Sequence, residues 1–306
     1  MRVLVLLDPP EKLNPSGDTS LVIIKELIRK KFSVFACEHE DLGVFNGTPT
    51  PRAYQLSLSK SGKPKVESEA SKKKLDSFEI ILFRQDPPFN LSYLHATQLI
   101  DLSGVKIVAN STRGLRAANE KIYALRFSDS MPDTIVSRNK KEILHFVKTV
   151  GTAVLKPLDS FGGIGVVLAR KSDKGTPAII DMMTREGADQ ILAQRFVKGI
   201  DKRIFVIGGE VKGVMDRIGL KSDFRANMHV GGQPRLGTLT KTEKVRLEPV
   251  LECLKNDGIY FAGLDLIGGY LSEVNVTSPT GFYHYRKISG VNLAEAFVSG
   301  LFSITF

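Results

Sequence analysis

The chain has 306 residues, 42% of them hydrophobic and 25% charged, which is ordinary globular composition for one large domain or two to three small ones. Its two cysteines, Cys37 and Cys253, exclude a disulfide framework and a Cys-x-x-Cys metal or redox motif. No apolar run approaches the roughly 18 residues that cross a bilayer, and residues 1–8 do not resemble a signal peptide. We therefore expect a cytoplasmic protein with no membrane partner.

The formal net charge is +10, which raises the question of a polyanionic partner. The densest basic run, residues 60–74, has six lysines and two glutamates. It is rich in serine and has no interleaved aromatic residues, so it is interpreted as a solvated loop. No nucleic-acid-binding motif occurs elsewhere. We expect no nucleic-acid partner and assign the excess charge to ATP and acidic small substrates.

The first part of the chain predicts alternating strands and helices. Strands are expected at residues 2–8, 33–37, 79–84 and 106–109, with helices at about 20–31 and 93–100. This order is typical of an α/β sheet that ends near residue 115. Loops at the carboxyl ends of such strands usually form ligand sites, and Arg84 stands at one of these ends.

From residue 119 the pattern changes to mixed strands, glycine loops and hairpins. Strands are expected at 153–157, 166–170, 191–197, 203–208 and 210–217, followed by a last hairpin within 263–276 and a closing helix near 292–302. We expect a second structural region here.

A glycine-rich loop at 159–165 follows the strand that carries Lys156. Backbone N–H groups of such a loop can approach phosphate oxygens, although the same glycines also suit a plain turn. Lys156 favours the phosphate interpretation because a charge at the end of a buried strand requires a partner. Lys121 fits either a phosphate contact or an exposed helix position.

Arg203, Arg217 and Arg225 occur in a run with Lys202 and Asn227. Several converging guanidinium groups could clamp a phosphoryl group during its transfer. The alternative is that they pair with three acidic residues on the sheet surface: Asp201, Asp216 and Asp223. The five histidines show no metal-ligand spacing and are interpreted as structural or exposed.

Asp265, Glu273 and Asn275 lie on two apolar strands around a Gly-Gly turn. Glu273 and Asn275 share one face of their strand, and three oxygen donors on one hairpin suggest Mg²⁺ shared with a nucleotide. A plain two-residue turn would place Asp265 opposite Ser272 on the wrong face. A three-residue loop or a one-residue bulge would place Asp265 opposite Glu273, and we predict one of these. The alternative is an ordinary hairpin with acidic residues on its wet face.

Several segments occur in the same order as in one known family. They are ILFRQDPPF at 81–89, NEK at 119–121, LKPLD at 155–159 followed by Gly162 and Gly163, DKR at 201–203, GLDLI at 263–267 and EVNVTSPT at 273–280. Together they resemble bacterial glutathione synthetase, an ATP-grasp ligase, from residue 1 to about residue 280. The resemblance implies an α/β fold: a doubly wound N-terminal domain at 1–118, then a two-lobed ATP-grasp fold with a central lid at 119–200 and a C-terminal lobe at 201–306.

The resemblance also implies the reaction. The γ-phosphoryl group of ATP would pass to the carboxylate of γ-glutamylcysteine, and the amine of glycine would then displace phosphate to form a peptide bond. ATP would be the co-substrate, and Mg²⁺, with Mn²⁺ as an alternative, would be the metal.

The implied site residues follow from the matching positions. ATP would contact Lys121, Lys156, Asp159, Gly162, Gly163, Gln194, Phe196, Val197, Asp201 and Arg203. Two Mg²⁺ ions would be held by Asp265, Glu273 and Asn275. Arg217 and Arg225 would steady the acyl phosphate, and the dipeptide would contact Arg84, Asn227, Ser278 and Thr280.

The chain departs from the family pattern at three places. Residues 281–287 read GFYHYRK where acidic and aliphatic residues are usual, residues 219–225 replace a glycine-rich loop, and Arg195 stands at the nucleotide hinge. These changes bear on the substrate more than on the reaction. Two alternatives therefore stay open, a related ligase that acts on another peptide or carboxylate and a non-catalytic nucleotide sensor. The sequence also leaves open whether the chain forms a homo-oligomer.

Overall fold

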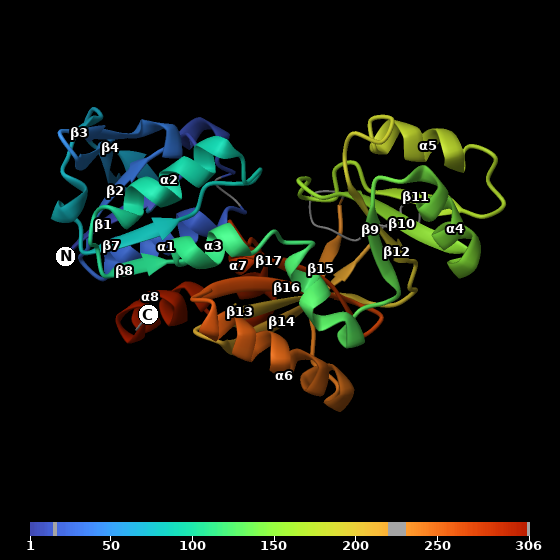
Figure 1. The fold of residues 1–306 in the computed structure, drawn as a ribbon. Coiled ribbons are helices and arrows are strands. Elements are labelled where there is room, and N and C mark those ends of the chain that lie inside the picture. The colour runs from blue at the N-terminus through green and yellow to red at the C-terminus, as the bar shows by residue number, and fades with distance from the viewer. Residues whose placement is uncertain (15–16, 220–230, 305–306) are drawn as a thin grey trace.

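The computed structural model describes residues 1–14, 17–219 and 231–304, which form three β-sheets with helices packed against them (Figure 1). The N-terminal sheet and a small second sheet form two separate lobes, and the third sheet lies between and below them. The predicted α/β class is confirmed. Short 3-10 turns complete the path: η1 (Pro10–Lys12), η2 (His39–Asp41), η3 (Leu75–Ser77), η4 (Tyr123–Ser130) and η6 (Leu301–Ser303).

The N-terminal sheet has the strand order β3-β4-β2-β1-β7-β8. Its parallel strands are β1 (Arg2–Leu6), β2 (Ser33–Cys37), β7 (Ile80–Phe83) and β8 (Ile107–Ala109). Val3 and Val5 share a buried cluster with α1 (Thr19–Arg29), whereas Leu4 and Leu6 share one with α2 (Leu91–Asp101). Because successive side chains of a strand point to opposite faces, the two helices cover opposite faces of the sheet. This is the doubly wound arrangement that was predicted.

Each helix of this lobe begins at a side-chain cap. Asp18 accepts hydrogen bonds from the backbone N–H groups of Ser20 (2.6 Å) and Leu21 (3.2 Å) at the start of α1. Asn90 caps α2 in the same way, and Ser111 caps α3 (Thr112–Ala117). Such caps satisfy backbone donors that the first turn of a helix leaves unpaired.

The edge of the N-terminal sheet differs from the sequence prediction. Residues 60–74 are not only a loop, because β5 (Pro64–Val66) and β6 (Ser71–Lys72) pair with β4 (Thr48–Leu58). β4 also pairs with β3 (Leu42–Phe45). The two prolines of β4 argue against a strand in the sequence. They are tolerated because the register pairs Pro49 and Pro51 with β3 only, while β2 pairs with residues 54–56.

The second sheet is antiparallel, with the order β11-β10-β12-β9. Its strands are β9 (Thr134–Ser137), β10 (Thr152–Pro157), β11 (Val167–Arg170) and β12 (Ile191–Arg195). Ala153 and Leu155 of β10 share a buried cluster with α4 (Lys140–Val150) and α5 (Thr176–Met183). The alternation of a strand therefore turns Val154 and Lys156 to the face away from these helices.

The third sheet is also antiparallel, with the order β15-β14-β13-β16-β17. Its strands are β13 (Asp201–Ile207), β14 (Glu210–Ile218), β15 (Gln233–Leu236), β16 (Phe261–Ile267) and β17 (Tyr270–Asn275). Ile204 and Leu264 pack with α6 (Lys241–Asn256) on one face. Phe205 and Phe261 pack on the other face with α7 (Phe282–Ser289) and α8 (Leu293–Gly300), and α8 lies beside the N-terminal lobe (Figure 1).

One buried side chain links the N-terminal sheet to the third sheet. Asn110, directly after β8, donates to the carbonyl oxygens of Phe261 (2.8 Å) and Val276 (2.7 Å) and accepts from the N–H of Phe261 (2.7 Å). These bonds fix both strands of the last hairpin relative to the N-terminal lobe.

No helix in the described residues is long and apolar enough to cross a membrane.

Candidate active site

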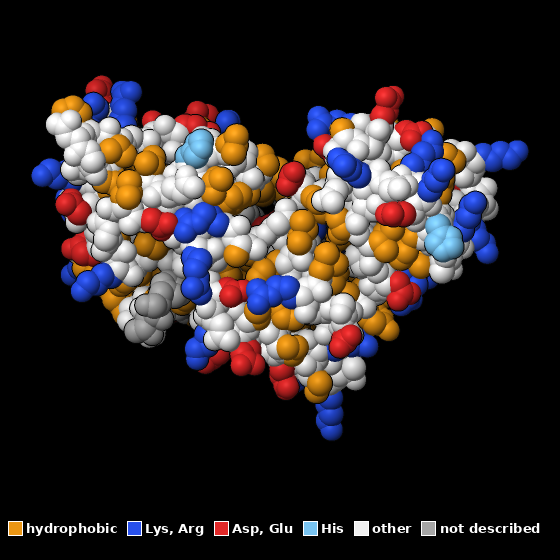
Figure 2. Space-filling view, viewed as in Figure 1, with side chains coloured by type: hydrophobic (Ala, Val, Ile, Leu, Met, Phe, Trp, Pro, Cys, Tyr) orange, Lys and Arg blue, Asp and Glu red, His pale blue; other side chains and the backbone are white. Residues whose placement is uncertain are grey.

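Two cavities meet at the middle of the third sheet. The first, about 400 Å³, lies between the second and third sheets, and the second, about 290 Å³, lies between the third sheet and the N-terminal lobe. Figure 2 shows the surface hollowed between the two lobes. Arg217, Asp265 and Glu273 line both cavities. A ligand that fills both would therefore pass over these three side chains.

The first cavity contains many of the residues expected to contact ATP. Those that line it are Lys156, Gly163, Gln194, Phe196, Val197 and Asp201. Lys156 Nζ donates to Gln194 Oε1 (3.1 Å) and to Ser272 Oγ (2.9 Å), and it forms no ion pair with a carboxylate of the described residues. Burial lowers the pKa of Lys156. A buried ammonium group held only by neutral partners is suited to receive an anionic ligand.

The register of the last hairpin follows the predicted bulge. Ile267 pairs with Tyr270 across a two-residue turn, Gly268-Gly269, in which both residues have positive φ (+57° and +80°). Leu266 pairs with Leu271 in the same register, and the register then shifts so that Asp265 pairs with Glu273. Ser272 is the extra residue, and its hydroxyl contacts Lys156. The prediction of a bulge is confirmed, whereas the alternative of a three-residue loop is wrong.

Asp265 lies at the centre of a buried group of charges. It accepts from Arg203 Nε (2.7 Å) and Nη2 (3.1 Å), and Arg217 Nη2 lies 3.1 Å from its Oδ1. Burial opposes ionisation of Asp265, but the two guanidinium groups outweigh it and hold its pKa below the ordinary value. Burial raises the pKa of Asp201, although its ion pair with Arg217 works in the opposite direction.

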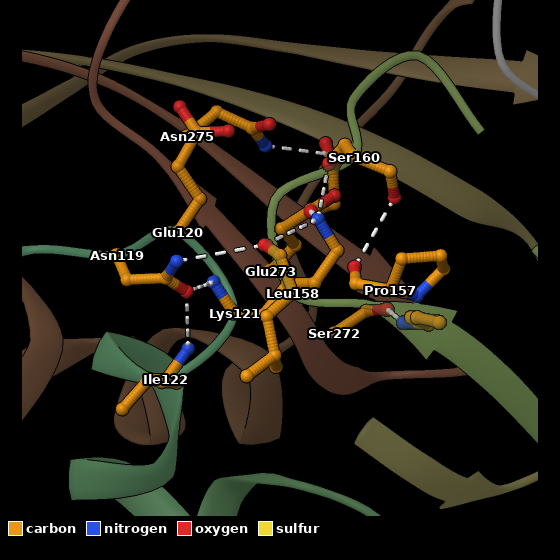
Figure 3. Close-up of polar contacts among 12 residues, drawn as sticks. Asn119, Glu120, Lys121, Ile122, Pro157, Leu158, Ser160, Ser272, Glu273 and Asn275 are labelled. Carbon is orange, nitrogen blue, oxygen red and sulfur yellow. Dashed lines mark hydrogen bonds and ion pairs between the residues drawn. The ribbon is translucent and has the colours of Figure 1, made fainter. Parts of the chain in front are cut away.

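Lys121 connects Glu273 to the glycine-rich loop (Figure 3). Its Nζ lies 3.1 Å from Glu273 Oε1, and it also donates to the carbonyl oxygens of Leu158 and Ser160. Asn119 accepts from the backbone N–H of Lys121 and donates to Leu158 O (3.5 Å). Lys121 is buried, so the structure excludes the exposed helix position that was the alternative to a phosphate contact.

The second cavity contains other predicted residues. Those that line it are Gly162, Arg203, Asn275, Ser278 and Thr280. Asn275 Nδ2 donates to Gly263 O (3.0 Å) and to Asp265 Oδ2 (3.3 Å), so it lies beside the carboxylate with which it was grouped. Arg225 and Asn227 lie outside the described residues.

Three predicted residues do not line either cavity: Lys121, Arg84 and Asp159. Arg84 is buried and donates to Ser20 Oγ (3.1 Å) and Pro279 O (3.0 Å), while its own carbonyl accepts from Ser278. Arg84 therefore supports the backbone of the second cavity from behind. Asp159 is exposed and is not among the residues that line either cavity.

The structure also adds residues that sequence reasoning did not single out. Glu120 lines the second cavity and accepts from Val276 N (2.9 Å), Thr277 N (3.2 Å) and Thr277 Oγ1 (2.8 Å). Its position inside the NEK segment was the available signal. His284 also lines this cavity, and burial lowers its pKa. The sequence showed no signal for this position, because His284 was interpreted as structural or exposed.

The donor groups at the junction suit a hard divalent cation. Asp265, Glu273 and Asn275 offer carboxylate and amide oxygens from facing positions of one hairpin, which is the donor chemistry that Mg²⁺ prefers. Within residues 1–14, 17–219 and 231–304, no group of three or more His, Cys, Asp or Glu is placed to hold a metal. A metal here would thus depend on two carboxylates, the amide and the oxygens of a bound ligand.

The fold defines an ATP-grasp protein. Solved structures that share it include the D-cycloserine synthetase DcsG, with a TM-score of 0.68 at 14% identity, covering 98% of this chain and 99% of that one. They also include the macrocyclase MdnC of Microcystis aeruginosa, bound with the precursor peptide MdnA, with a TM-score of 0.65 at 15% identity, covering 99% of this chain and 100% of that one. At such identities the likeness shows the fold alone.

Family models and sequence relatives identify the chain more closely. The model of the prokaryotic glutathione synthetase N-terminal domain matches residues 1–116, and that of the prokaryotic glutathione synthetase ATP-grasp domain matches residues 120–290. Glutathione synthetase of Gloeobacter violaceus is 37% identical, covering 100% of this chain and 98% of that protein. Glutathione synthetase of a Synechocystis species is 36% identical, covering 98% and 99%.

The chain belongs to the prokaryotic glutathione synthetase family, as its ordered motifs predicted. It is an ATP-dependent ligase that forms a peptide bond, and members of the family use ATP with Mg²⁺ and act on small molecules.

Replacing Asp265 by asparagine tests the charge at the junction of the cavities. We expect Asp265→Asn to lower kcat for ATP-dependent phosphate release by at least about 100-fold. The reason is that the variant loses the negative charge of the carboxylate at the point where metal and phosphate would meet. Asp216→Asn is the matched control, since Asp216 is also buried and paired with an arginine (Arg235, 2.9 Å) but does not line either cavity. The kcat of this control variant should stay within about threefold of that of the parent protein. Equal rates in both variants would refute the role of Asp265.

The lowered pKa of Lys156 predicts a pH-dependent affinity for ADP. An anionic phosphate favours the charged amine, so above the pKa of the free protein each binding event must take up a proton. The Kd of metal-free ADP, measured by calorimetry, should therefore begin to rise at a pH below the ordinary lysine pKa of about 10.4, by up to about tenfold per pH unit. Lys156→Arg should remove most of this rise, because a guanidinium stays charged throughout. If the Kd of ADP for the parent protein did not change with pH, this result would contradict a phosphate contact by Lys156.

Proposed function

We propose that the chain joins γ-glutamylcysteine to glycine at the expense of ATP, releasing ADP and phosphate. The observation that carries the proposal is that one set of charged residues lines both cavities. A nucleotide in the first cavity and a peptide carboxylate in the second would meet at Arg217, Asp265 and Glu273. That is the geometry a phosphoryl transfer between two bound molecules requires.

The nucleotide would lie in the first cavity with its phosphates toward the junction. Gln194, Phe196 and Val197 would contact the adenine, and Lys121 and Lys156 the phosphates. The loop at 159–165, with Gly162 and Gly163, would close over the phosphates, with Asp159 at its start. Asp201 and Arg203 would complete the site by holding Arg217 and Asp265 in position through the ion pairs already present.

The metal would be held by Asp265, Glu273 and Asn275 together with phosphate oxygens. When bound, Mg²⁺ supplies positive charge that neutralises the triphosphate. In its absence the same carboxylates are neutralised by Arg203, Arg217 and Lys121. The hairpin therefore keeps its charges paired before any ligand arrives.

The reaction would proceed in two displacements. First, an oxygen of the substrate carboxylate attacks the γ-phosphorus of ATP, the bond to the bridging oxygen breaks, and ADP leaves with those electrons. The amine nitrogen of glycine then attacks the acyl carbon, phosphate leaves, and the nitrogen loses a proton. Arg217, with Arg225 from outside the described residues, would steady the acyl phosphate through charge-assisted hydrogen bonds.

The dipeptide would occupy the second cavity. Ser278 and Thr280 line it, and Arg84 would act through its hydrogen bond to Pro279 O, which holds this segment in place. Asn227 would contribute from outside the described residues.

The domain limits at 118 and 200 fit this separation of the nucleotide and peptide sites, since the second sheet ends at Arg195 and the third begins at Asp201. We place the reaction in the cytoplasm, where Cys37 and Cys253 stay unpaired.

A substrate panel tests this assignment. ADP formation, measured with Mg²⁺ and ATP, should require γ-glutamylcysteine and glycine together, and mass spectrometry should show their condensation product. Omitting either substrate should lower the rate by at least about 100-fold, because acyl phosphate formation needs the carboxylate and turnover needs the amine. Faster turnover with another peptide or amine than with this pair would overturn the substrate assignment and leave the ligase reaction standing.

A further inference from the structure

A third cavity, of about 550 Å³, lies on the far side of α7 from the second cavity. Its walls come from α1, from the turn between β4 and β5, and from α7. α7 separates the two spaces, because His284 lines the second cavity and Tyr283 and Lys287 line the third. Asp18 is the only residue common to the described linings of both, and the third cavity shares none with the first.

The lining of the third cavity is strongly basic. Lys25 and Arg29 come from α1, Lys63 from the β4–β5 turn, and Arg286 and Lys287 from α7. Lys25 and Arg29 are like charges four residues apart on one helix, a spacing that destabilises a helix by itself. Side chains far apart in the sequence thus place cations around one space, where their repulsion costs stability unless an anion is present.

The two acidic residues of this cavity, Asp18 and Glu26, neutralise only part of this positive charge. Asp18 is occupied as the N-cap of α1, accepting from two backbone N–H groups. Glu26 accepts from Arg29 (3.1 Å) and from Asn292 Nδ2 (3.1 Å). In the part of the chain that the structure describes, Lys25, Lys63 and Arg286 have no carboxylate partner. The positive charge around the space is therefore largely uncompensated.

A second observation concerns Asn292, which also lines the cavity. Its Oδ1 is buried and has no hydrogen-bond partner among the described residues, while its Nδ2 is held by Glu26. Buried polar atoms almost always have a partner. Because this oxygen is closed to solvent, a ligand in the cavity does not reach it in the present side-chain position, and the cations alone define what the cavity can bind.

We propose that the third cavity is a second anion-binding site for a small molecule with at least two phosphate or carboxylate groups. Its volume lies within the range of small-molecule sites. Arg286 supplies a planar guanidinium group that can pair bidentately with such oxygens. Tyr283 is the only aromatic residue in its described lining, and Lys287 Nζ already lies 4.8 Å from the centroid of that ring, so the site offers no free stacking platform for a nucleobase.

Calorimetric titration of the full chain tests this site. The protein is kept in saturating ADP, so that the first cavity is filled. Metal is left out because the probes would chelate it. The probes are citrate, which carries three carboxylates, and inorganic pyrophosphate. We expect one equivalent of at least one probe to bind, and the stronger one identifies the preferred anion.

Variants with matched charge locate the binding. Lys25→Gln combined with Arg286→Gln should weaken the Kd of the probe by at least about tenfold. Lys65→Gln combined with Lys141→Gln removes the same charge outside the cavity, since Lys65 pairs with Glu67 (3.2 Å) and Lys141 lies on α4, and should change the Kd by less than about twofold. Lys63→Gln alone should also weaken the Kd, which provides a second variant if the first pair folds poorly.

Three results would overturn the proposal. The first is that neither probe binds to the ADP-loaded protein. The second is that both double variants lose the same affinity, which would show an effect of net charge alone. The third is that a short DNA duplex binds more tightly than either probe with the same dependence on Lys25 and Arg286, which would assign the surface to nucleic acid.

Discussion

The one-residue bulge at Ser272 determines which side chains of β17 face Asp265. Without it, continuous pairing from the Gly268-Gly269 turn would set Asp265 opposite Ser272 and turn Glu273 to the other face, because a slip of one residue reverses every side chain of a strand. The link between the second and third sheets crosses the same turn. A Cβ at Gly199 would lie 2.3 Å from the Cα of Gly268, and Gly268 N donates to Ile200 O (3.1 Å). The hairpin therefore orders the carboxylates and also positions the lobe that carries Lys156.

The charges at this junction depend on one another. Asp265 is buried, and its ionised form is held by Arg203 and Arg217, while Arg217 is shared with Asp201. Removing one member of such a buried group leaves an unpaired charge at a cost of about 3–5 kcal/mol, whereas the complete group is close to neutral in its effect on stability. We infer that the arrangement serves ligand binding, because a triphosphate and a metal can take over partners that are already in place.

Local pattern in the sequence predicted the parts of the fold that depend on neighbours along the chain. The βαβ start and the bulged hairpin both follow from strand alternation and turn chemistry. The prediction of strands and hairpins after residue 119 missed α4, α5, α6 and α7, although the Thr240–Glu243 capping box marks the start of α6. The burial of Arg84 behind the second cavity depends on Ser20 and Pro279, which lie far from it in the sequence. The third cavity likewise exists only because the topology brings residues 25, 63 and 286 together.

We propose that the last hairpin holds a divalent metal through Asp265, Glu273 and Asn275. Electron paramagnetic resonance of Mn²⁺, titrated into the protein with saturating ADP, tests it without relying on turnover. We predict that Glu273→Gln weakens Mn²⁺ binding by at least about 30-fold, while Glu252→Gln, on the exposed side of α6, leaves it within about twofold. The affinity for ADP without metal should be retained in both variants. Unchanged Mn²⁺ affinity in Glu273→Gln would contradict the claim.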